Sequence, residues 1–241
     1  MKSNNDNFDA IIIGSGIGGL VTASQLAAKG SQVLVLEKYI IPGGSGGSFK
    51  RKGYTFDVGA SMIFGFGKKG YTNLLTRALK DVNERCETIP DPVQLEYHLP
   101  NNLNISVDRN YEQFINNLSA RFPKEKEGIK KFYDTCAGVF NCLDSMPLLS
   151  IEDPSYLLKV FFKSPFSCLG LARWLPVNAG DVARKFIKDP ELLKFIDIEC
   201  FCWSVMPALK TPMINAGMVF TDRHAGGINY PKGGVGTIAD K

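Results

Sequence analysis

The sequence predicts an α/β fold that begins with a dinucleotide-binding βαβ unit and continues into a largely helical region. A run over residues 8–13, apolar except for Asp9, leads into a glycine-rich turn, and a second run over residues 32–36, apolar after Gln32, ends at the acidic Glu37. Strand, glycine turn, helix, strand and terminal acid, in this order, form the unit that holds the pyrophosphate and ribose of a dinucleotide. Farther along the chain, apolar residues recur at helical spacing.

Each glycine of the turn has its own physical role. Gly14 permits the tight step from strand to helix, Gly16 lets the backbone approach a pyrophosphate, and Gly19 lets the helix lie close to the sheet. The carboxylate of Glu37 then lies where it can accept both hydroxyls of an adenosine ribose. A glycine turn without a nucleotide is the alternative, and the apolar strand and helical pattern around this turn argue against it. The predicted cofactor-binding residues of this unit are Gly14, Ser15, Gly16, Gly18, Gly19, Glu37 and Lys38.

A second glycine cluster, residues 41–49, comes directly after this unit, where a nicotinamide-binding domain would continue into an ordinary helix. Backbone N–H groups in such a turn form a concavity that binds anions, here on the other side of the same pyrophosphate. This favours FAD, a long and enclosed cofactor, over NAD. A mobile loop is the alternative, but residues 53–61 follow at once and are typical of an ordered strand and turn. The predicted contacts are Gly43, Gly44 and Ser45.

The composition is that of a soluble globular chain, with 44% hydrophobic and 22% charged residues and a net charge of +4. Basic residues do not cluster in the pattern of a nucleic-acid reader, so we expect no nucleic-acid partner. The first seven residues are polar, so we expect neither a secretory leader nor a transit peptide. The uncharged run over residues 10–28 is as long as a membrane span, but its glycines occupy the nucleotide-turn positions. We therefore expect no transmembrane helix.

The six cysteines are scattered along the chain, and we expect them to be free thiols of an intracellular protein. Cys200 and Cys202 would need further ligands to hold a metal, and the two histidines, His98 and His224, show no ligand spacing to them. We therefore expect no metal site.

The middle of the chain predicts two short strands followed by amphipathic helices. The strands cover residues 93–97 and 104–108, and apolar residues follow at helical spacing over 111–122 and 129–143. We expect the apolar faces of these helices to form core, although a tunnel for a long apolar ligand would use the same residue types.

Residues 154–187 combine many aromatic and aliphatic side chains with basic residues and a single acid, Asp181. Such a segment can lie in the headgroup layer of a membrane, with its cations on anionic lipids. A helical hairpin packed inside the protein is the alternative.

Several segments together resemble one family of flavoproteins. They are residues 14–19, 37–38, 42–45, 56–62 and 222–234. The sequence of the last segment is Asp-Arg-His-Ala-Gly-Gly-Ile-Asn-Tyr-Pro-Lys-Gly-Gly. The first segment is shared by hundreds of flavoproteins, whereas the last is much more specific. The sequence resembles the carotenoid isomerase branch of the phytoene desaturase-like flavoproteins, and the resemblance covers the whole chain.

The resemblance implies a two-domain enzyme, in which an FAD-binding Rossmann-like domain is interrupted by an inserted, largely helical α+β substrate domain. We assign residues 1–80 to the first part of the FAD-binding domain and 81–225 to the substrate and membrane-associated domain. Residues 226–241 begin the return to the FAD-binding domain. Family members continue well beyond this point, so we expect their C-terminal cofactor-contacting segment to be missing here.

The implied reaction is cis-to-trans isomerisation of a poly-cis carotene such as prolycopene, without net oxidation and with FAD in its reduced form. A carotene has almost no free aqueous concentration, which favours peripheral membrane contact on the cytoplasmic side. Asp222, Arg223 and His224 are candidates for tuning or proton transfer. A purely structural role is the alternative for His224, a lone histidine beside glycine turns.

Two other functions remain open. A flavin desaturase or saturase shares nearly every motif but changes its substrate by two electrons. A prenyl-lipid-binding protein of the GDP-dissociation-inhibitor type resembles this fold and carries out no flavin chemistry, but such proteins tend to have a degraded phosphate loop.

Overall fold

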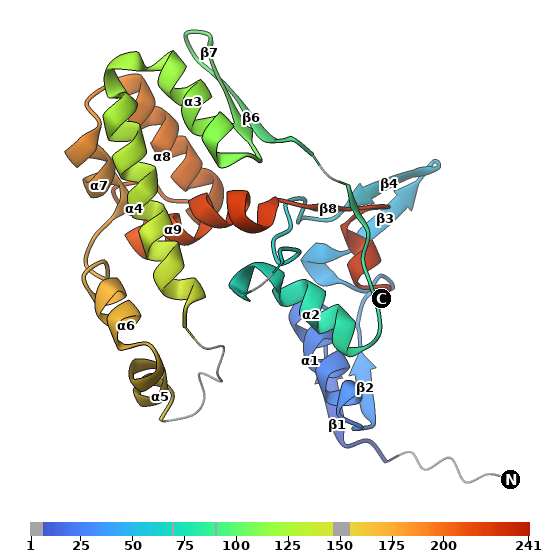
Figure 1. The fold of residues 1–241 in the computed structure, drawn as a ribbon. Coiled ribbons are helices and arrows are strands. Elements are labelled where there is room, and N and C mark those ends of the chain that lie inside the picture. The colour runs from blue at the N-terminus through green and yellow to red at the C-terminus, as the bar shows by residue number, and fades with distance from the viewer. Residues whose placement is uncertain (1–6, 69, 90, 147–154) are drawn as a thin grey trace, which may run out of the picture. The chain divides into compact units, whose positions relative to one another are not determined.

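The computed structural model describes residues 7–68, 70–89, 91–146 and 155–241, and it divides into two compact units (Figure 1). The glycine-rich unit comprises Met1–Asp91 and Ile228–Lys241, and the helical unit comprises Pro92–Gly227. Strands dominate the former and helices the latter, which confirms the predicted α/β class with a largely helical insertion.

The glycine-rich unit contains a βαβ segment, two antiparallel strand pairs and several short helical turns. Its elements are β1 (Ala10–Ile13), α1 (Ile17–Ala28), β2 (Val33–Leu36), η1 (Gly44–Gly46), β3 (Ser48–Arg51), β4 (Tyr54–Asp57), η2 (Gly70–Asn73), α2 (Leu74–Asp81), β5 (Thr88–Ile89), β8 (Tyr230–Pro231) and η5 (Val235–Ile238). Strands β1 and β2 pair in parallel with α1 as their connection, β3 pairs with β4, and β5 pairs with β8. The βαβ unit predicted from the first forty residues is thus confirmed.

Strand β1 half-buries one of its faces and exposes the other. Ile12 faces α1, whereas 57% of Ile11 and 88% of Ile13 are exposed on the opposite face. Parallel strands are normally covered on both faces, because their side chains are apolar on both. Within the described residues β1 and β2 have no further strand beside them. The pair therefore presents an open apolar face and open edges.

The end of the chain returns to the glycine-rich unit. Besides the pairing of β8 with β5, Asn229 and Ile63 exchange backbone hydrogen bonds of 2.8 and 3.1 Å. Strand β5 pairs with β8, and the first part of the glycine-rich unit extends to Asp91. The sequence had suggested a boundary at residue 80. The return likewise begins at Ile228 rather than at residue 226.

The helical unit opens with a β-hairpin and continues with seven described helices, most of which contribute to one core. Its elements are β6 (Val93–Leu99), β7 (Leu103–Asp108), α3 (Tyr111–Arg121), η3 (Pro123–Glu125), α4 (Lys126–Asp144), α5 (Tyr156–Lys163), α6 (Pro165–Ala172), α7 (Ala179–Phe186), α8 (Pro190–Ser204), α9 (Met213–Asp222) and the π-helical turn η4 (Arg223–Gly227). The strands and helices predicted for residues 93–143 are confirmed.

The core of the helical unit lies around α4. Phe114, Phe132 and Phe195 are fully buried and belong to one apolar cluster that also takes in α9. Gly217 lets α9 approach α4 closely, because a Cβ at this position would stand 2.7 Å from the side chain of Val139. The apolar helix faces predicted from the sequence therefore form packed core in this unit.

None of the described helices is long and apolar enough to cross a bilayer. Over the same residues, no group of three His, Cys, Asp or Glu side chains is placed to hold a metal ion, and the six cysteines are free thiols. Residues 1–6 of the polar N-terminal segment, and residue 154 of the predicted membrane segment, lie outside the described residues.

Candidate functional site

The turn between β1 and α1 leaves an uncapped helix N-terminus. Gly14 adopts a positive φ of 96°, and its N–H donates to the carbonyl of Leu36 at 2.7 Å, which ties the turn to the end of β2. Gly16 is the N-cap of α1, and no side chain caps it. The N–H groups of a first helical turn lack partners within the helix, and they carry the positive end of the helix dipole. This end of α1 is therefore suited to an anion such as pyrophosphate.

Gly16 and Gly18 border open space, as Gly14 does, whereas Gly19 is packed tightly. A Cβ built on Gly16 or Gly18 would have no atom within 4 Å, whereas a Cβ on Gly19 would stand 2.2 Å from the carbonyl oxygen of Gly14. Gly19 thus allows helix and strand to touch. Gly16 and Gly18 keep the backbone accessible from the side on which a ligand would lie.

The second glycine cluster meets the first. The N–H of Gly43, which has a φ of 101°, donates to the carbonyl of Ser15 at 2.7 Å. A Cβ on Gly44 would stand 3.2 Å from the Cα of Gly16, and the carbonyl of Ser45 accepts the N–H of Ala60 at 2.9 Å. The structure therefore brings together the two segments that the sequence predicted to lie on one pyrophosphate.

Glu37 is held at the end of β2 by three hydrogen bonds. Its Oε2 accepts both the N–H and the hydroxyl of Ser15, at 2.7 and 2.6 Å, and its Oε1 accepts the N–H of Tyr39 at 2.8 Å. The hydroxyl of Ser15 is the main cause that lowers the pKa of Glu37 to about 2, with the backbone donors adding to it. Glu37 is therefore an anion and a pure acceptor at any physiological pH. Lys38, next to it, is exposed.

These groups fit a dinucleotide. They supply an uncapped helix N-terminus for the phosphates, two bare glycines at the border of open space, and an ionised acceptor for a ribose. We call the set of residues 14–19, 37 and 43–45 the glycine cradle.

Asp57 links two of the family-resembling segments within the same unit. One carboxylate oxygen accepts the hydroxyl of Tyr230 at 2.7 Å, and the other accepts the hydroxyl of Ser48 and the N–H of Val235, both at 2.8 Å. Burial opposes ionisation of this carboxyl, but the hydrogen bonds outweigh it and lower its pKa. The segment after residue 228 is thus fastened beside the strand pair that follows the cradle.

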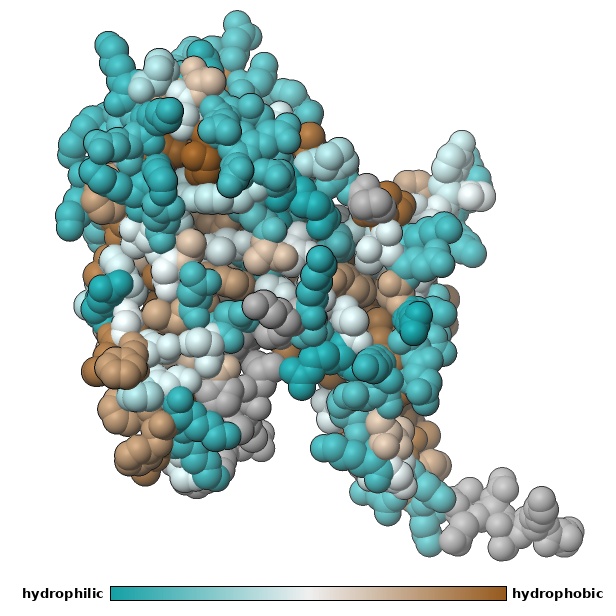
Figure 2. Space-filling view, in the orientation of Figure 1, coloured by the Kyte–Doolittle hydropathy of each residue, from teal (hydrophilic) through white to brown (hydrophobic). Residues whose placement is uncertain are grey.

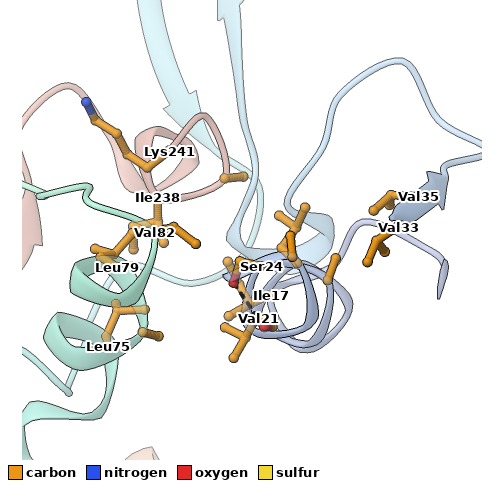
Figure 3. A pocket seen from close by; sticks show the side chains of 15 residues that line it. Ile17, Val21, Ser24, Val33, Val35, Leu75, Leu79, Val82, Ile238 and Lys241 are labelled. Carbon is orange, nitrogen blue, oxygen red and sulfur yellow. Dashed lines mark hydrogen bonds between the residues drawn. The ribbon is translucent and has the colours of Figure 1, made fainter. Parts of the chain in front are cut away.

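A separate apolar pocket of about 270 Å³ lies between α1, α2 and η5 (Figure 3). Ile17 and Val21 of α1 face Leu79 of α2 across it, and Ile238 closes one side. None of the cradle glycines lines this pocket, so its chemistry suits an apolar side chain rather than a phosphate.

Arg223, one of the three residues proposed for catalysis, is fully buried in the helical unit. Its guanidinium is paired with Glu199, and Tyr133 donates its hydroxyl to the other oxygen of that carboxylate at 2.8 Å. The rings of Phe114 and Phe220 lie 4.9 and 5.1 Å from the guanidinium carbon. The charge is therefore neutralised by Glu199 and enclosed by aromatic faces.

The sequence analysis did not single out Glu199. One signal was present: Leu192, Phe195, Ile196 and Glu199 fall on the same buried face of α8, and an acid on such a face requires a buried partner. The sequence does not name that partner, which is 24 residues away in the chain.

His224 packs beside this ion pair with both ring nitrogens engaged. Nε2 accepts the Nε–H of Arg223 at 3.1 Å, and Nδ1 lies 3.3 Å from the carbonyl of Arg109, to which it donates in the neutral tautomer. Burial, and then the charge of Arg223, lower the pKa of His224 to about 3. The ring is neutral at physiological pH and packs against Phe114 with a centroid distance of 5.3 Å and an interplanar angle of 30°.

Asp222 is the member of the three that can exchange a proton near neutral pH. It is 9% exposed, and its Oδ1 has no hydrogen-bond partner in the described part of the chain. Burial raises its pKa to about 6, although the N–H of Gly226 opposes the shift. The three predicted residues are therefore consecutive in the chain but differ in chemistry.

Comparison with known proteins places these features in context. Residues 12–79 match the family model of the NAD(P)-binding Rossmann-like domain. Over 96% of its length, the chain is 62% identical to the chloroplastic prolycopene isomerase of Daucus carota. It is 28% identical, over 97% of its length, to the all-trans-retinol 13,14-reductase of Rattus norvegicus. The chain spans 38% of the length of the Daucus carota isomerase and 39% of the length of the Rattus norvegicus reductase.

Among solved structures, an oxidoreductase from Methanosarcina mazei superimposes with a TM-score of 0.58 at 19% sequence identity. The match covers 96% of this chain and 47% of the other. This similarity supports the fold described above.

The cradle predicts opposite outcomes for two glycines. Gly16→Val should leave the fold intact, because the new side chain enters open space, and should weaken ADP binding at least about tenfold by blocking the approach of the pyrophosphate. Gly19→Ala should lower the melting temperature, because its Cβ meets the carbonyl of Gly14. Calorimetric titration with ADP and thermal unfolding by circular dichroism measure the two effects. ADP binding by Gly16→Val as tight as that of the parent chain would contradict this assignment.

The raised pKa of Asp222 predicts that the stability of the helical unit depends on pH. The pKa of Asp222 is about 6 in the folded protein, above the ordinary value of 3.8. The free energy of unfolding is therefore highest while the carboxyl is protonated, and it falls as the pH rises from about 4 through 6. Asp222→Asn, which stays neutral, should therefore be more stable than the parent by roughly 2 kcal/mol at pH 8, after allowance for solvent screening, and should lose this difference at pH 4.

Urea unfolding followed by tryptophan fluorescence measures this difference, because both tryptophans, Trp174 and Trp203, lie in the helical unit. Glu112→Gln, at an exposed position of the same unit, is the control. A stability difference between Asp222→Asn and the parent that is independent of pH would show that Asp222 does not titrate in this range.

Proposed function

We propose that this chain, which matches the N-terminal portion of the prolycopene isomerases over nearly its whole length, serves the FAD-dependent cis-to-trans isomerisation of a poly-cis carotene without net oxidation. The intact glycine cradle carries the proposal, together with the 62% identity to the Daucus carota isomerase. The activity is that of a complete enzyme, of which the chain supplies the cradle and the helical unit.

In this proposal the cradle binds and orients the cofactor. The first-turn N–H groups of α1 receive the pyrophosphate, the loop around Gly44 covers its other side, and Glu37 accepts a hydroxyl of the adenosine ribose. Reduced FAD, when bound, supplies electron density that lowers the double-bond order of the polyene, so that a conjugated bond can rotate.

For the helical unit we propose that Asp222 holds the exchangeable proton, with Arg223 and His224 as its supports. The raised pKa of Asp222 is what favours it, since a general acid works best when its pKa is close to the operating pH. The buried pair of Arg223 with Glu199 fixes the turn that begins directly after Asp222. His224, neutral and engaged at both nitrogens, stabilises the same turn.

The alternatives are weaker. A desaturase or saturase would use the same cradle, and the similarity to the retinol reductase favours this class, but at 28% rather than 62% identity. A prenyl-lipid carrier would not need the phosphate-binding glycines, yet Gly14, Gly16 and Gly19 are intact and so is Glu37.

We further propose that a second polypeptide layer completes the cofactor site. The open face of β1, with Ile11 and Ile13 exposed, and the apolar pocket closed by Ile238 are surfaces that such a layer would bury. A typical C-terminal part of the family, joined to the chain or mixed with it, would supply that layer. Residues 1–241 alone should bind FAD weakly and should not isomerise carotenes.

The reaction can be tested with the chain alone and with the chain mixed with the C-terminal part of the Daucus carota enzyme. We expect flavin absorbance and conversion of poly-cis lycopene only in the mixture, under anaerobic conditions with prereduced FAD. The product should have the mass of the substrate. A mass change of two hydrogens would assign the protein to the desaturases or saturases, and turnover by the chain alone would disprove the need for a second layer.

Helices α5 and α6 are the proposed membrane contact. Phe162 is 78% exposed and Phe166 is 87% exposed, and apolar residues gather over these helices at the lower left of the molecule (Figure 2). Lys159, Lys163 and Arg173 are exposed within the same segment. Aromatic side chains flanked by cations suit the headgroup layer of an anionic membrane.

Replacing Lys159, Lys163 and Arg173 by glutamate should release the protein from anionic liposomes, since each basic residue near such a surface contributes about 1 kcal/mol. The same charge change at Lys124, Lys126 and Lys210, which are exposed in the helical unit outside α5 and α6, is the matched control. Co-sedimentation with phosphatidylserine vesicles is the measurement. If both triple variants sediment equally, α5 and α6 are not the membrane contact.

A further inference from the structure

Ser15 connects the three parts of the glycine cradle. It lies between Gly14 and Gly16 and is 3% exposed. Its N–H and its hydroxyl both donate to Oε2 of Glu37, at 2.7 and 2.6 Å, and its carbonyl accepts the N–H of Gly43 at 2.7 Å. One small side chain thus joins the β1–α1 turn to the end of β2 and to the second glycine loop.

The N–H and the hydroxyl of Ser15 both bind Oε2 of Glu37 and leave Oε1 able to accept a further hydrogen bond. A carboxylate has about four acceptor positions over its two oxygens. Ser15 takes two positions on Oε2, and the N–H of Tyr39 takes one on Oε1. The side chain of Glu37 is otherwise exposed, so the hydrogen bonds from Ser15 and Tyr39, with a weaker backbone contribution from Lys38, hold its carboxylate in place.

We infer that the hydroxyl of Ser15 is a positioning group that orients Glu37 for the adenosine ribose, and that it thereby makes the cradle selective for ribose over deoxyribose nucleotides. This inference rests on the proposed FAD site. Ser15 does not itself touch the ribose; it prevents rotation of the carboxylate. An acceptor that is already oriented binds a hydroxyl without the entropy loss of ordering a long, exposed side chain.

The charge state of Glu37 supports this role. The hydroxyl of Ser15 is the largest of the causes that lower its pKa to about 2. Loss of that hydroxyl should therefore raise the pKa of Glu37, a readout that needs no bound ligand. The backbone donors from Ser15, Lys38 and Tyr39 would remain, so the carboxylate would still be ionised at neutral pH and only its orientation would be freer.

The test compares ADP with 2′-deoxy-ADP and 3′-deoxy-ADP by calorimetric titration. The parent chain should prefer ADP to at least one deoxy analogue, and Ser15→Ala should reduce that preference roughly tenfold, the worth of one hydrogen bond to a charged group. In the background of Glu37→Ala, the Ser15 substitution should have no further effect. Ser24→Ala is the matched control, because Ser24 lies on α1, outside the cradle, and its hydroxyl donates to the carbonyl of Val21.

Carboxyl NMR titration of Glu37 in Ser15→Ala supplies the second readout, and an upward pKa shift is expected. Unchanged ribose preference in Ser15→Ala, with ADP still bound, would overturn this inference and leave the proposed FAD site standing. Absence of ADP binding by the parent chain, both alone and mixed with the C-terminal part of the Daucus carota enzyme, would overturn both. Loss of affinity for ADP and both deoxy analogues by the same factor would assign Ser15 a purely structural role and would also overturn the inference.

Discussion

The close approach of α1 to β1 is the constraint on which the candidate cofactor site depends. A Cβ at Gly19 would stand 2.2 Å from the carbonyl oxygen of Gly14, so no other residue permits this contact without a shift of the helix. The contact determines where α1 begins and therefore where its first N–H groups point. It also fixes Ser15, whose donors hold Glu37 and whose carbonyl holds Gly43. The binding groups of the cradle are thus consequences of one backbone packing contact.

The helical unit depends on a different kind of contact, the buried pair of Glu199 and Arg223. Neither side chain is exposed, and removal of one partner would leave the other charge buried without compensation, at a cost of about 3–5 kcal/mol. Aromatic rings from α3, α4 and α9 surround the guanidinium, so the pair joins α8 to the turn that follows α9. This explains why Arg223, which is conspicuous in the sequence, is enclosed rather than presented to a ligand.

The sequence predicted those parts of the structure whose cause is local. The turn around Gly14 and Gly16, the strand ending at Glu37 and the helical spacing around Phe132 each follow from residues close together in the chain, and the fold confirms them. Contacts between distant segments could not be predicted in this way. The Glu199–Arg223 pair depends on how α8 and α9 pack, and the unit boundary at Asp91 depends on the pairing of β5 with β8. The bond from Ser15 to Glu37 depends on one side-chain rotamer, which no spacing rule specifies.

The chain uses the same functional group in two opposite ways, and environment alone decides which. Glu37 is exposed and receives three hydrogen bonds, which favour the ionised form and lower its pKa to about 2. Asp222 is buried, and one of its oxygens has no hydrogen-bond partner among the described residues, so desolvation dominates and raises its pKa to about 6. The former is suited to be a permanent acceptor for a neutral hydroxyl, and the latter to hold or release a proton. In the proposed isomerisation, the former would help to bind the cofactor and the latter would stabilise transient charge on the substrate. The proposed division places the acceptor in the glycine-rich unit and the proton in the helical unit.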